Sequence, residues 1–401
     1  MKVSLWFKGC LLAYLLVAMP LFADSLEGPR SVAEELEPKN GLTNPDIRST
    51  YFKDTFSSWF EFKDKLKKEN HLDLGFDYSI VGSLSDADIG EDNALGHDIR
   101  FYGTWTPLNP DGTNSGMLTF KFENRHAFTN LAPQSYGFNV GALAINAAQF
   151  SDAGWIVTNL FWKQRFMNDR LTLGFGIVDI TDFIDVFPLA NPLTGFMNLA
   201  FSISPAIAVP NQGLGAAGGF WFSDNIYSIA SIADANADPG SPEFDVFETG
   251  ETFKHIEFGY TPNKELQFLK NFHITLWQQD ERKDQGIPED WGVTASWSWL
   301  YNNRWSTFVR GGWNDKGTAL YQKSFSAGMG YLTNEQDLIA MGFNWGESAN
   351  RDTQKTIEAF YNYKVTELLA VTLDIQQIFD PVFNPDDNVV GIYQLRLRMS
   401  F

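Results

Sequence analysis

Apolar and polar positions alternate strictly at the end of this chain. Apolar side chains occupy every second position from Tyr393 to Phe401, and polar ones such as Arg396 and Arg398 lie between them. A period of two residues predicts a β-strand with one apolar and one polar face. The last twelve residues are therefore expected to form a strand with an apolar environment on one side and water on the other.

The same alternation recurs from residue 71 onward and predicts sixteen strands. Each predicted strand is about long enough to cross a bilayer at a tilt, which takes roughly 9–11 residues. The expected strands are 71–82, 97–106, 116–126, 154–166, 170–180, 214–223, 225–234, 252–260, 272–280, 290–300, 303–313, 322–332, 336–346, 355–364, 368–378 and 390–401.

The connections between these strands alternate between short and long. Tight turns are expected near residues 167–169, 224, 301–302, 333–335 and 366–367, and long polar loops at 83–96, 127–153, 181–213, 235–251, 281–289, 347–354 and 379–389. An even strand number with short turns at one end and long loops at the other is typical of outer-membrane barrels. The terminal Phe401, with apolar and aromatic residues at alternate positions, resembles the C-terminal signal of Gram-negative outer-membrane β-barrels. We therefore predict an all-β, antiparallel transmembrane barrel over residues 71–401.

The N-terminus agrees with export from the cytoplasm. Lys2 and Lys8 precede an apolar run at residues 11–17, and a small residue, Ala23, follows the breaker Pro20. This pattern predicts a secretory signal peptide at residues 1–23, with an anchoring helix as the alternative. Cys10 would leave with that peptide, so the mature chain would contain no cysteine, no disulfide and no thiolate metal site.

Two segments separate the signal peptide from the first strand. Residues 24–48 are polar and rich in Pro and Glu, and we interpret them as a flexible leader. Aromatic residues at mixed helical spacing then alternate with lysines and predict a short amphipathic helix within residues 49–68. This helix could plug or brace the periplasmic mouth of the barrel, or simply lead into it; the two segments together span residues 24–70.

The charge of the chain limits its partners. The formal net charge is −19, and it becomes −21 once Lys2 and Lys8 are removed with the signal peptide. Such acidity argues against nucleic acid as a partner. It fits acidic outer loops that bind divalent cations at a lipopolysaccharide surface, although solubility alone would also explain it. No residue pattern indicates a cofactor or a metal site.

Alternation also assigns the polar side chains to the lumen, because a charged group facing lipid would cost about 2–4 kcal/mol at the bilayer midplane. The long loop at 181–213 carries four phenylalanines among its polar residues, so we predict that it folds inward and narrows the channel; packing outside the barrel is the alternative. Three strand cations, Arg100, Lys121 and Arg125, are expected to face this loop. The candidate pore-lining residues are Arg100, Tyr102, Lys121, Glu123, Arg125, Asp179, Asp182, Asp185, His255, Glu257, Arg310, Asp374, Arg396 and Arg398.

The candidate residues suit a neutral polyol. Guanidinium and carboxylate groups hydrogen-bond hydroxyls, and aromatic rings pack on the C–H face of a pyranose. The alternative is that the inward charges only hold one another in ladders across the wall. Because Trp is enriched at membrane interfaces, Trp105, Trp297 and Trp305 are expected in the interfacial girdles rather than at a sugar site.

Several segments together resemble one known family. FWKQ at 161–164 precedes DRLTLGFGIVD at 169–179, DF at 182–183 and FMN at 196–198. PNQGLG at 210–215 and ADA at 233–235 follow, and IEAFYNY at 357–363 leads to VTLDIQ at 371–376. In order and spacing these are similar to the carbohydrate-selective porins, the OprB-like family. The resemblance implies a sixteen-stranded barrel that passes sugars passively through a constriction lined by basic residues.

The predicted function is passive, partly selective diffusion of small sugars across a bacterial outer membrane, by weak contacts that a solute can leave. The alternative is a general or cation-preferring porin, which the negative charge favours. An enzyme is not expected, because the five histidines, at 71, 97, 126, 255 and 273, lie in no recognisable catalytic motif. A structural or adhesive barrel is a further alternative, and the sequence leaves the oligomeric state, monomer or trimer, open.

Overall fold

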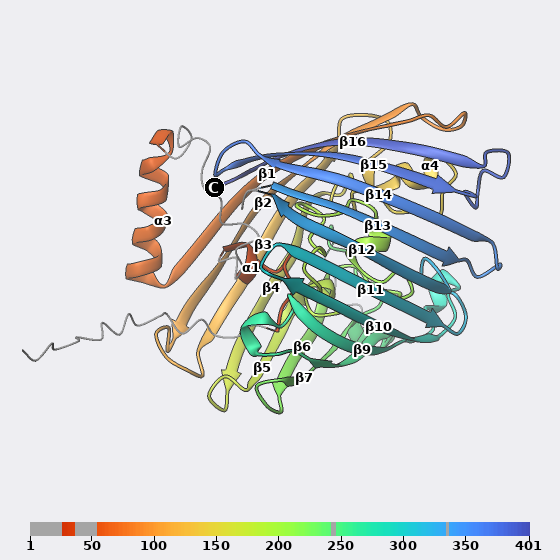
Figure 1. Ribbon diagram of the computed structural model, residues 1–401. Helices are drawn as coiled ribbons and strands as arrows, with labels where there is room; N and C mark the ends of the chain where they lie inside the picture. The colour runs from red at the N-terminus through yellow and green to blue at the C-terminus, as the bar shows by residue number, and fades with distance from the viewer. Residues whose placement is uncertain (1–25, 37–53, 242–245, 334–336) are drawn as a thin grey trace, which may run out of the picture.

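The computed structural model describes residues 26–36, 54–241, 246–333 and 337–401 of the chain. Sixteen strands form one closed antiparallel barrel, in which each strand pairs with its neighbours in sequence and β1 pairs with β16 (Figure 1). The prediction of sixteen strands is confirmed. The predicted signal peptide at 1–23 and the first residues of the predicted helix, 49–53, lie outside the described residues.

The strands are β1 (Leu72–Ser85), β2 (Asn93–Leu108), β3 (Gly116–Ala127), β4 (Gly154–Phe166), β5 (Leu171–Val178), β6 (Gly213–Trp221), β7 (Ile226–Asp234), β8 (Thr252–Tyr260), β9 (Lys270–Gln279), β10 (Asp290–Tyr301), β11 (Trp305–Asn314), β12 (Lys323–Thr333), β13 (Asp337–Glu347), β14 (Thr353–Lys364), β15 (Leu369–Phe379) and β16 (Val389–Ser400). The α-helices are α1 (Val32–Leu36), α3 (Ser57–Asn70), α4 (Tyr136–Asn139), α5 (Leu199–Ser202) and α6 (Val246–Thr249). Short 3₁₀ turns lie at Pro133–Ser135, Ile180–Asp182, Lys264–Leu266 and Lys283–Gln285. No described helix is long and apolar enough to cross a membrane.

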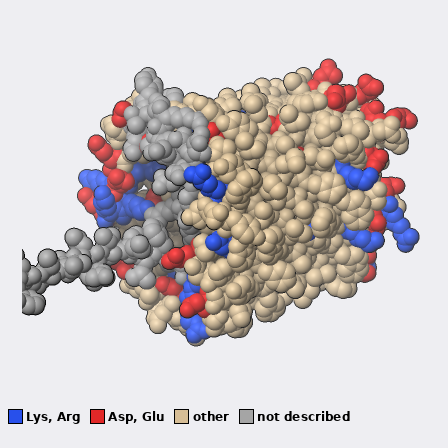
Figure 2. Space-filling model, viewed as in Figure 1, with Lys and Arg blue, Asp and Glu red and all other residues tan. Residues whose placement is uncertain are grey.

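The two faces of the wall follow the alternation of the sequence. On β8, Ile256 and Phe258 are exposed on the outer surface, whereas Glu257 between them is fully buried inside. On the face that Figure 2 shows, the middle of the barrel is a broad band almost without charged side chains, and most Lys, Arg, Asp and Glu residues gather towards its two ends. This band is the apolar belt that a lipid environment requires of a spanning barrel.

The barrel closes where its first and last strands meet. Tyr78 of β1 lies opposite Met399 of β16, and the backbone N–H of Phe401 donates to the carbonyl of Phe76 at 2.8 Å. Helix α3 lies beside this seam: the Phe56 ring meets the Phe401 ring edge-on at 4.9 Å, and Lys63 Nζ donates to the Phe401 carbonyl at 2.9 Å. The amphipathic helix predicted before β1 is therefore present, beginning at Ser57, and it lies at the end of the barrel where the chain terminates (Figure 1).

Part of the predicted leader is ordered. Residues 26–36 lie inside the barrel and include the one-turn helix α1, whereas the rest of the leader, at 24–25 and 37–48, lies outside the described residues. Leu26, Ser31 and Val32 are buried, and Leu26 belongs to an apolar cluster with the wall residue Phe161. The Pro-rich composition suggested disorder, but here the fixed backbone of a Pro-containing segment is held by partners that are distant in the sequence.

Candidate functional site

The loop between β5 and β6 lies inside the barrel and is tied to the opposite wall. Glu358 of β14 accepts hydrogen bonds from the backbone N–H groups of Met197 at 2.5 Å and Asn198 at 3.1 Å. Arg396 of β16 donates to the carbonyls of Pro192 at 2.5 Å and Gly195 at 3.2 Å. Because the ends of the loop are fixed by β5 and β6, these bonds hold its middle across the lumen.

A second set of bonds holds the first part of the loop against β8, β9 and β11. The Asp185 carboxylate pairs with Arg310 and lies 3.2 Å from His273 Nε2. Glu257 accepts a hydrogen bond from the backbone N–H of Asp185 at 3.0 Å, and Ser204 N–H donates to Asp185 at 2.6 Å. All these side chains are buried, so the charges balance one another without access to water.

The phenylalanines of the loop make its apolar core. Phe196 packs at 4.9 Å from Phe201 and at 5.0 Å from Phe360 of β14, and Phe187 packs at 5.0 Å from Phe308 of β11. These rings bury the apolar part of the loop against the inner wall. They are therefore occupied in packing and do not line the open part of the lumen.

Another cluster of charges covers β1, β2, β3 and β16. Arg100 pairs with Asp77 of β1 and with Glu35 of α1, to which it donates at 2.6 and 3.0 Å. Arg398 donates to the same Asp77 carboxylate at 2.6 Å. Arg125 pairs with Glu123, whose other oxygen accepts from Thr158 at 3.1 Å. The inward cations of these strands are thus largely neutralised by neighbouring carboxylates.

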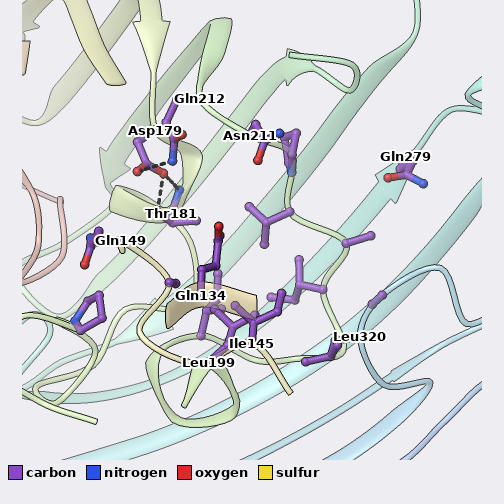
Figure 3. Close-up of a pocket in the computed structure, with 18 of the residues that line it drawn as sticks. Gln134, Ile145, Gln149, Asp179, Thr181, Leu199, Asn211, Gln212, Gln279 and Leu320 are labelled. Atoms are coloured by element: carbon purple, nitrogen blue, oxygen red, sulfur yellow. Dashed lines mark hydrogen bonds between the residues drawn. The ribbon is translucent and has the colours of Figure 1, made fainter. Parts of the chain in front are cut away.

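A cavity of about 290 Å³ remains between the loop and the wall (Figure 3). Its size is near the lower end of the roughly 300–1,000 Å³ typical of small-molecule sites. The connections after β3, β5, β9 and β11, all at the end of the barrel opposite α3, provide much of its lining. The polar lining residues are Arg30, Arg125, Gln134, Gln149, Asp179, Thr181, Asn211, Gln212, Gln279, Arg282 and Thr318.

The remaining lining of the cavity is aliphatic. Leu199, Ile203, Ile207 and Val209 come from the loop, and Leu320 faces them from the connection after β11. None of the residues that line the cavity is aromatic. A solute there would meet amide, carboxylate and guanidinium groups together with aliphatic side chains.

Asp179 holds part of the polar lining of the cavity in place. Its carboxylate accepts hydrogen bonds from the backbone N–H of Thr181 at 2.9 Å and from Gln212 Nε2 at 3.0 Å, as Figure 3 shows. Burial would raise the pKa of Asp179, but the nearby Arg30 and Lys121 and these hydrogen bonds outweigh it and lower the pKa below its usual range. Asp179 therefore carries a negative charge near neutral pH and acts as a fixed acceptor.

Asp182, three residues further on, behaves differently. Burial raises its pKa to about 7, and Asp179 and Glu27 add to the rise while Lys121 and Arg30 oppose it. Below that pH the carboxyl group is neutral, and above it the group is charged. The lumen is therefore expected to gain one negative charge as the pH rises through neutrality.

We expect this charge to be visible as ion selectivity. Raising the pH from about 6 to about 8, roughly one unit either side of the Asp182 pKa, should make reversal potentials in a KCl gradient more cation-selective. Asp182→Asn should remove this change. The control is Asp152→Asn on an exposed loop, where a hydrogen bond from the Ala127 backbone lowers the pKa, so that the pH response should persist. A response that survives Asp182→Asn would assign the titration to another group.

The predicted pore-lining residues fall into two groups. Arg125 and Asp179 line the cavity. The others do not line it, and they are buried or half-buried inside the barrel, in contact with each other, with the loop, with α1 or with neighbouring side chains of the wall: Arg100, Tyr102, Lys121, Glu123, Asp182, Asp185, His255, Glu257, Arg310, Asp374, Arg396 and Arg398. Arg100 and Lys121 therefore do not line the cavity that Arg125 lines.

Sequence reasoning missed several cavity residues. Arg30 was placed in the leader, and Gln134, Gln149, Asn211, Gln212, Gln279 and Arg282 lie on or beside loops whose paths alternation does not predict. The one available signal was the PNQG segment at 210–213, whose amides directly precede a strand. Among the described residues, no group of three or more His, Cys, Asp or Glu side chains is arranged to hold a metal ion.

A closed barrel of sixteen strands, with a loop folded into a charged lumen and an apolar band outside, defines a porin. The sequence profile of the carbohydrate-selective porin, OprB family, matches residues 116–301 and 272–401. The chain therefore belongs to the carbohydrate-selective porin, OprB family, which confirms the resemblance drawn from the sequence. Its members are outer-membrane channels that select carbohydrates.

Solved structures agree on the fold. The chain is similar to the high-pH structure of Pseudomonas putida OprB, with a TM-score of 0.68 and 15% identity over 86% of this chain and 97% of that one. The low-pH structure of the same protein gives a TM-score of 0.51 at 14% identity over 86% of this chain and 97% of that one. A mutant of the Rh. blastica porin gives 0.51 at 14% identity over 82% and 100% of the two chains. A search of curated protein sequences gave no significant match.

Proposed function

We propose that the cavity beside Asp179 is the first binding station for a small sugar that diffuses through this porin. The observation that supports it is the mixed lining of the cavity, which combines amide, carboxylate and guanidinium groups with aliphatic side chains. A pyranose has hydroxyl groups around its edge and C–H groups on its faces, so it would match both kinds of lining group. Binding there would be weak, because a channel must release its solute to pass it.

Each polar group has a distinct role in this proposal. The charged Asp179 accepts hydrogen bonds from hydroxyl groups, whereas Arg30 and Arg125 donate to hydroxyl oxygens from the inner side of the cavity. Gln212, which is held by Asp179, and Asn211 beside it can both donate and accept. Aromatic stacking, which the sequence led us to expect at a sugar site, plays no part in the cavity; aliphatic contacts take its place.

Current block by sugars tests this station. We expect Arg125→Ala to weaken block of the ion current by a monosaccharide about fivefold to tenfold, about 1–1.4 kcal/mol, as for one lost charged hydrogen bond. Open-channel current should change less, because the cavity is wider than an ion. The measurement is single-channel current against added sugar in planar bilayers.

The control for this test is Lys355→Ala, which removes a cation from an exposed pair with Asp380 far from the cavity, and its sugar block should be unchanged. If sugars never block even the unmodified channel, the cavity is not a sugar station. The protein would then act as a general or cation-preferring porin, as its negative charge would favour.

We further propose that the apolar band contacts the lipids of a Gram-negative-type outer membrane. Acidic side chains gathered at the end of the barrel opposite α3 support contact with divalent cations at a lipopolysaccharide surface (Figure 2). The absence of catalytic activity is likewise proposed from the family, whose members act as channels. Whether the barrel works as a monomer or a trimer is open to measurement by cross-linking in membranes.

A further inference from the structure

Residues 26–36, which we call the lumenal segment, are bound to the inner wall by two buried ion pairs. Glu27 pairs with Lys163 of β4 at 2.6 Å, and Glu35 pairs with Arg100 of β2 at 2.6 Å. The four side chains are between 1% and 3% exposed. Carboxylates of the chain itself thus occupy two basic positions on the wall of the channel.

The wall and the loop are shaped to receive this segment. On β6, a Cβ placed on Gly219 would lie 2.1 Å from Leu26 Cδ1, so the absence of a side chain there makes room for Leu26. On the loop side, a Cβ on Gly28 would lie 2.4 Å from Val186 Cγ1. The close approach on both sides shows that the lumenal segment is packed between the wall and the loop.

The lumenal segment also forms the floor of the cavity. Arg30 donates to the Thr181 carbonyl from Nε at 2.9 Å and from Nη2 at 2.6 Å, and the backbone N–H of Gly28 donates to the Asp182 carbonyl at 2.7 Å. Asn191 of the loop donates to the Pro29 carbonyl at 3.1 Å. A solute in the cavity would therefore meet Arg30, which belongs to the lumenal segment.

Charged side chains that point into the barrel from four of its strands are shielded from water. Asp77, Glu257, Glu358 and Arg396, which lie on β1, β8, β14 and β16, are each at most 1% exposed. The walls of a water-filled channel would be wet. The wall is covered at these positions, so the loop or the lumenal segment has to move before a solute can reach it.

The two elements differ in how they are held. The loop is fixed at both ends by β5 and β6 and is tied to the far wall through Glu257, Arg310, Glu358 and Arg396. The lumenal segment is joined to the barrel through its C-terminal side, and cleavage at the predicted site after Ala23 would leave it attached at that side alone. The lumenal segment can therefore leave the lumen with fewer contacts broken than the loop.

We propose that residues 26–36 form a plug that closes this channel and leaves the lumen when a solute passes. In the closed state Glu27 and Glu35 neutralise Lys163 and Arg100, and in the open state these two cations line the vacated path. This proposal depends on the barrel being a channel but not on its preference for sugars, because ion current alone reports whether the plug is in place.

A reversible cross-link tests the plug in the full-length mature protein. Leu26→Cys with Gly219→Cys places one thiol on the plug and one on β6, and Leu26 Cγ lies 3.2 Å from the Cβ position of residue 219. In a disulfide the Sγ of one cysteine lies about 3 Å from the Cβ of the other, so a sulfur near the Leu26 Cγ position fits a bridge to residue 219. Because the only cysteine in the sequence is Cys10, in the predicted signal peptide, no other thiol competes.

The same channels are measured before and after reduction in planar bilayers, and the two single-cysteine variants serve as controls. We expect the oxidised double variant to lose most of its ion current and reduction to restore it several-fold, whereas the single variants do not respond. A variant that lacks residues 26–36 should conduct several-fold more than the unmodified protein. Equal current in the oxidised and reduced forms would overturn the proposal, and so would failure of the cross-link to form.

Discussion

Shortening the loop between β5 and β6 is expected to raise single-channel conductance several-fold. Replacing residues 187–201 by a short Gly-Ser linker would remove the phenylalanine core and the bonds to Glu358 and Arg396 that hold the loop across the lumen. Water and ions would then occupy that space, and the current would increase with the open cross-section. The measurement is conductance of the reconstituted protein in KCl.

The matched control is a deletion of similar kind at the rim of the barrel. Removing residues 349–351, from the connection between β13 and β14, should leave conductance unchanged, because that connection does not line the cavity. Heat-modifiable migration on gels would confirm that both variants form a barrel. If the shortened loop leaves conductance at its original value in a folded barrel, the current does not pass where the loop lies.

The second large effect is expected at Arg310. Arg310→Ala would leave the Asp185 carboxylate buried beside His273 without its cation, and both Arg310 and Asp185 are at most 3% exposed. Removing one partner of a buried ion pair typically costs about 3–5 kcal/mol, because the other charge remains desolvated. We expect a loss of that size in the free energy of unfolding, together with noisier current from a loosened loop. Urea titration of the barrel in vesicles measures the first effect.

Two further variants test whether the loss of stability in Arg310→Ala comes from the buried charge of Asp185. Lys323→Ala removes a cation that is 47% exposed and paired with Glu347, and it should change stability by at most about 1 kcal/mol. Arg310→Met combined with Asp185→Leu removes both charges and should recover much of the lost stability. A double variant no more stable than Arg310→Ala would show that Arg310 acts through its packing on the Phe187 ring, 4.5 Å away, and not through its charge.

The strands could be predicted because lipid imposes their pattern directly on the sequence. A residue that faces lipid cannot be charged without a cost of about 2–4 kcal/mol, so every second position of each strand is constrained on its own. Glu257, for example, was assigned to the lumen because Ile256 and Phe258 flank it, and the structure has it there. This inference uses only residues that are adjacent in the sequence.

The interior could not be predicted in the same way, since its contacts join distant parts of the chain. Glu27 and Lys163 are 136 residues apart, and Glu35 and Arg100 are 65 apart. Nothing near Glu27 in the sequence indicates a buried partner, and a Pro-rich acidic segment usually remains unfolded. Arg100 therefore looked available to a solute, although α1 and Asp77 occupy its guanidinium group.

The packing of the aromatic residues in the loop could not be predicted either, because it also depends on contacts between distant parts of the chain. Phe187, Phe196 and Phe201 were the reason to expect that the loop folds inward, but the sequence does not indicate which residues cover them. In the structure they pack on Phe308 and Phe360 of the wall, and aliphatic residues such as Ile203 and Leu320 take the place beside the cavity. Which face of the loop packs on the wall depends on the wall side chains that bind the loop, and these side chains lie on β8, β11, β14 and β16.

The contact between α3 and the end of the chain has a consequence for assembly. Lys63 and Phe401, which meet at the β1–β16 seam, are 338 residues apart, so their contact closes a loop that includes nearly the whole barrel. Contacts between such distant residues form late in folding, since closing a long loop costs the most entropy. The contact between helix α3 and Phe401 can therefore form only after β16 has joined β1. Trypsin cleavage at Lys63, whose Nζ donates to the Phe401 carbonyl in the closed barrel, should be faster on assembly intermediates than on the finished protein, which makes this lysine a reporter of barrel completion.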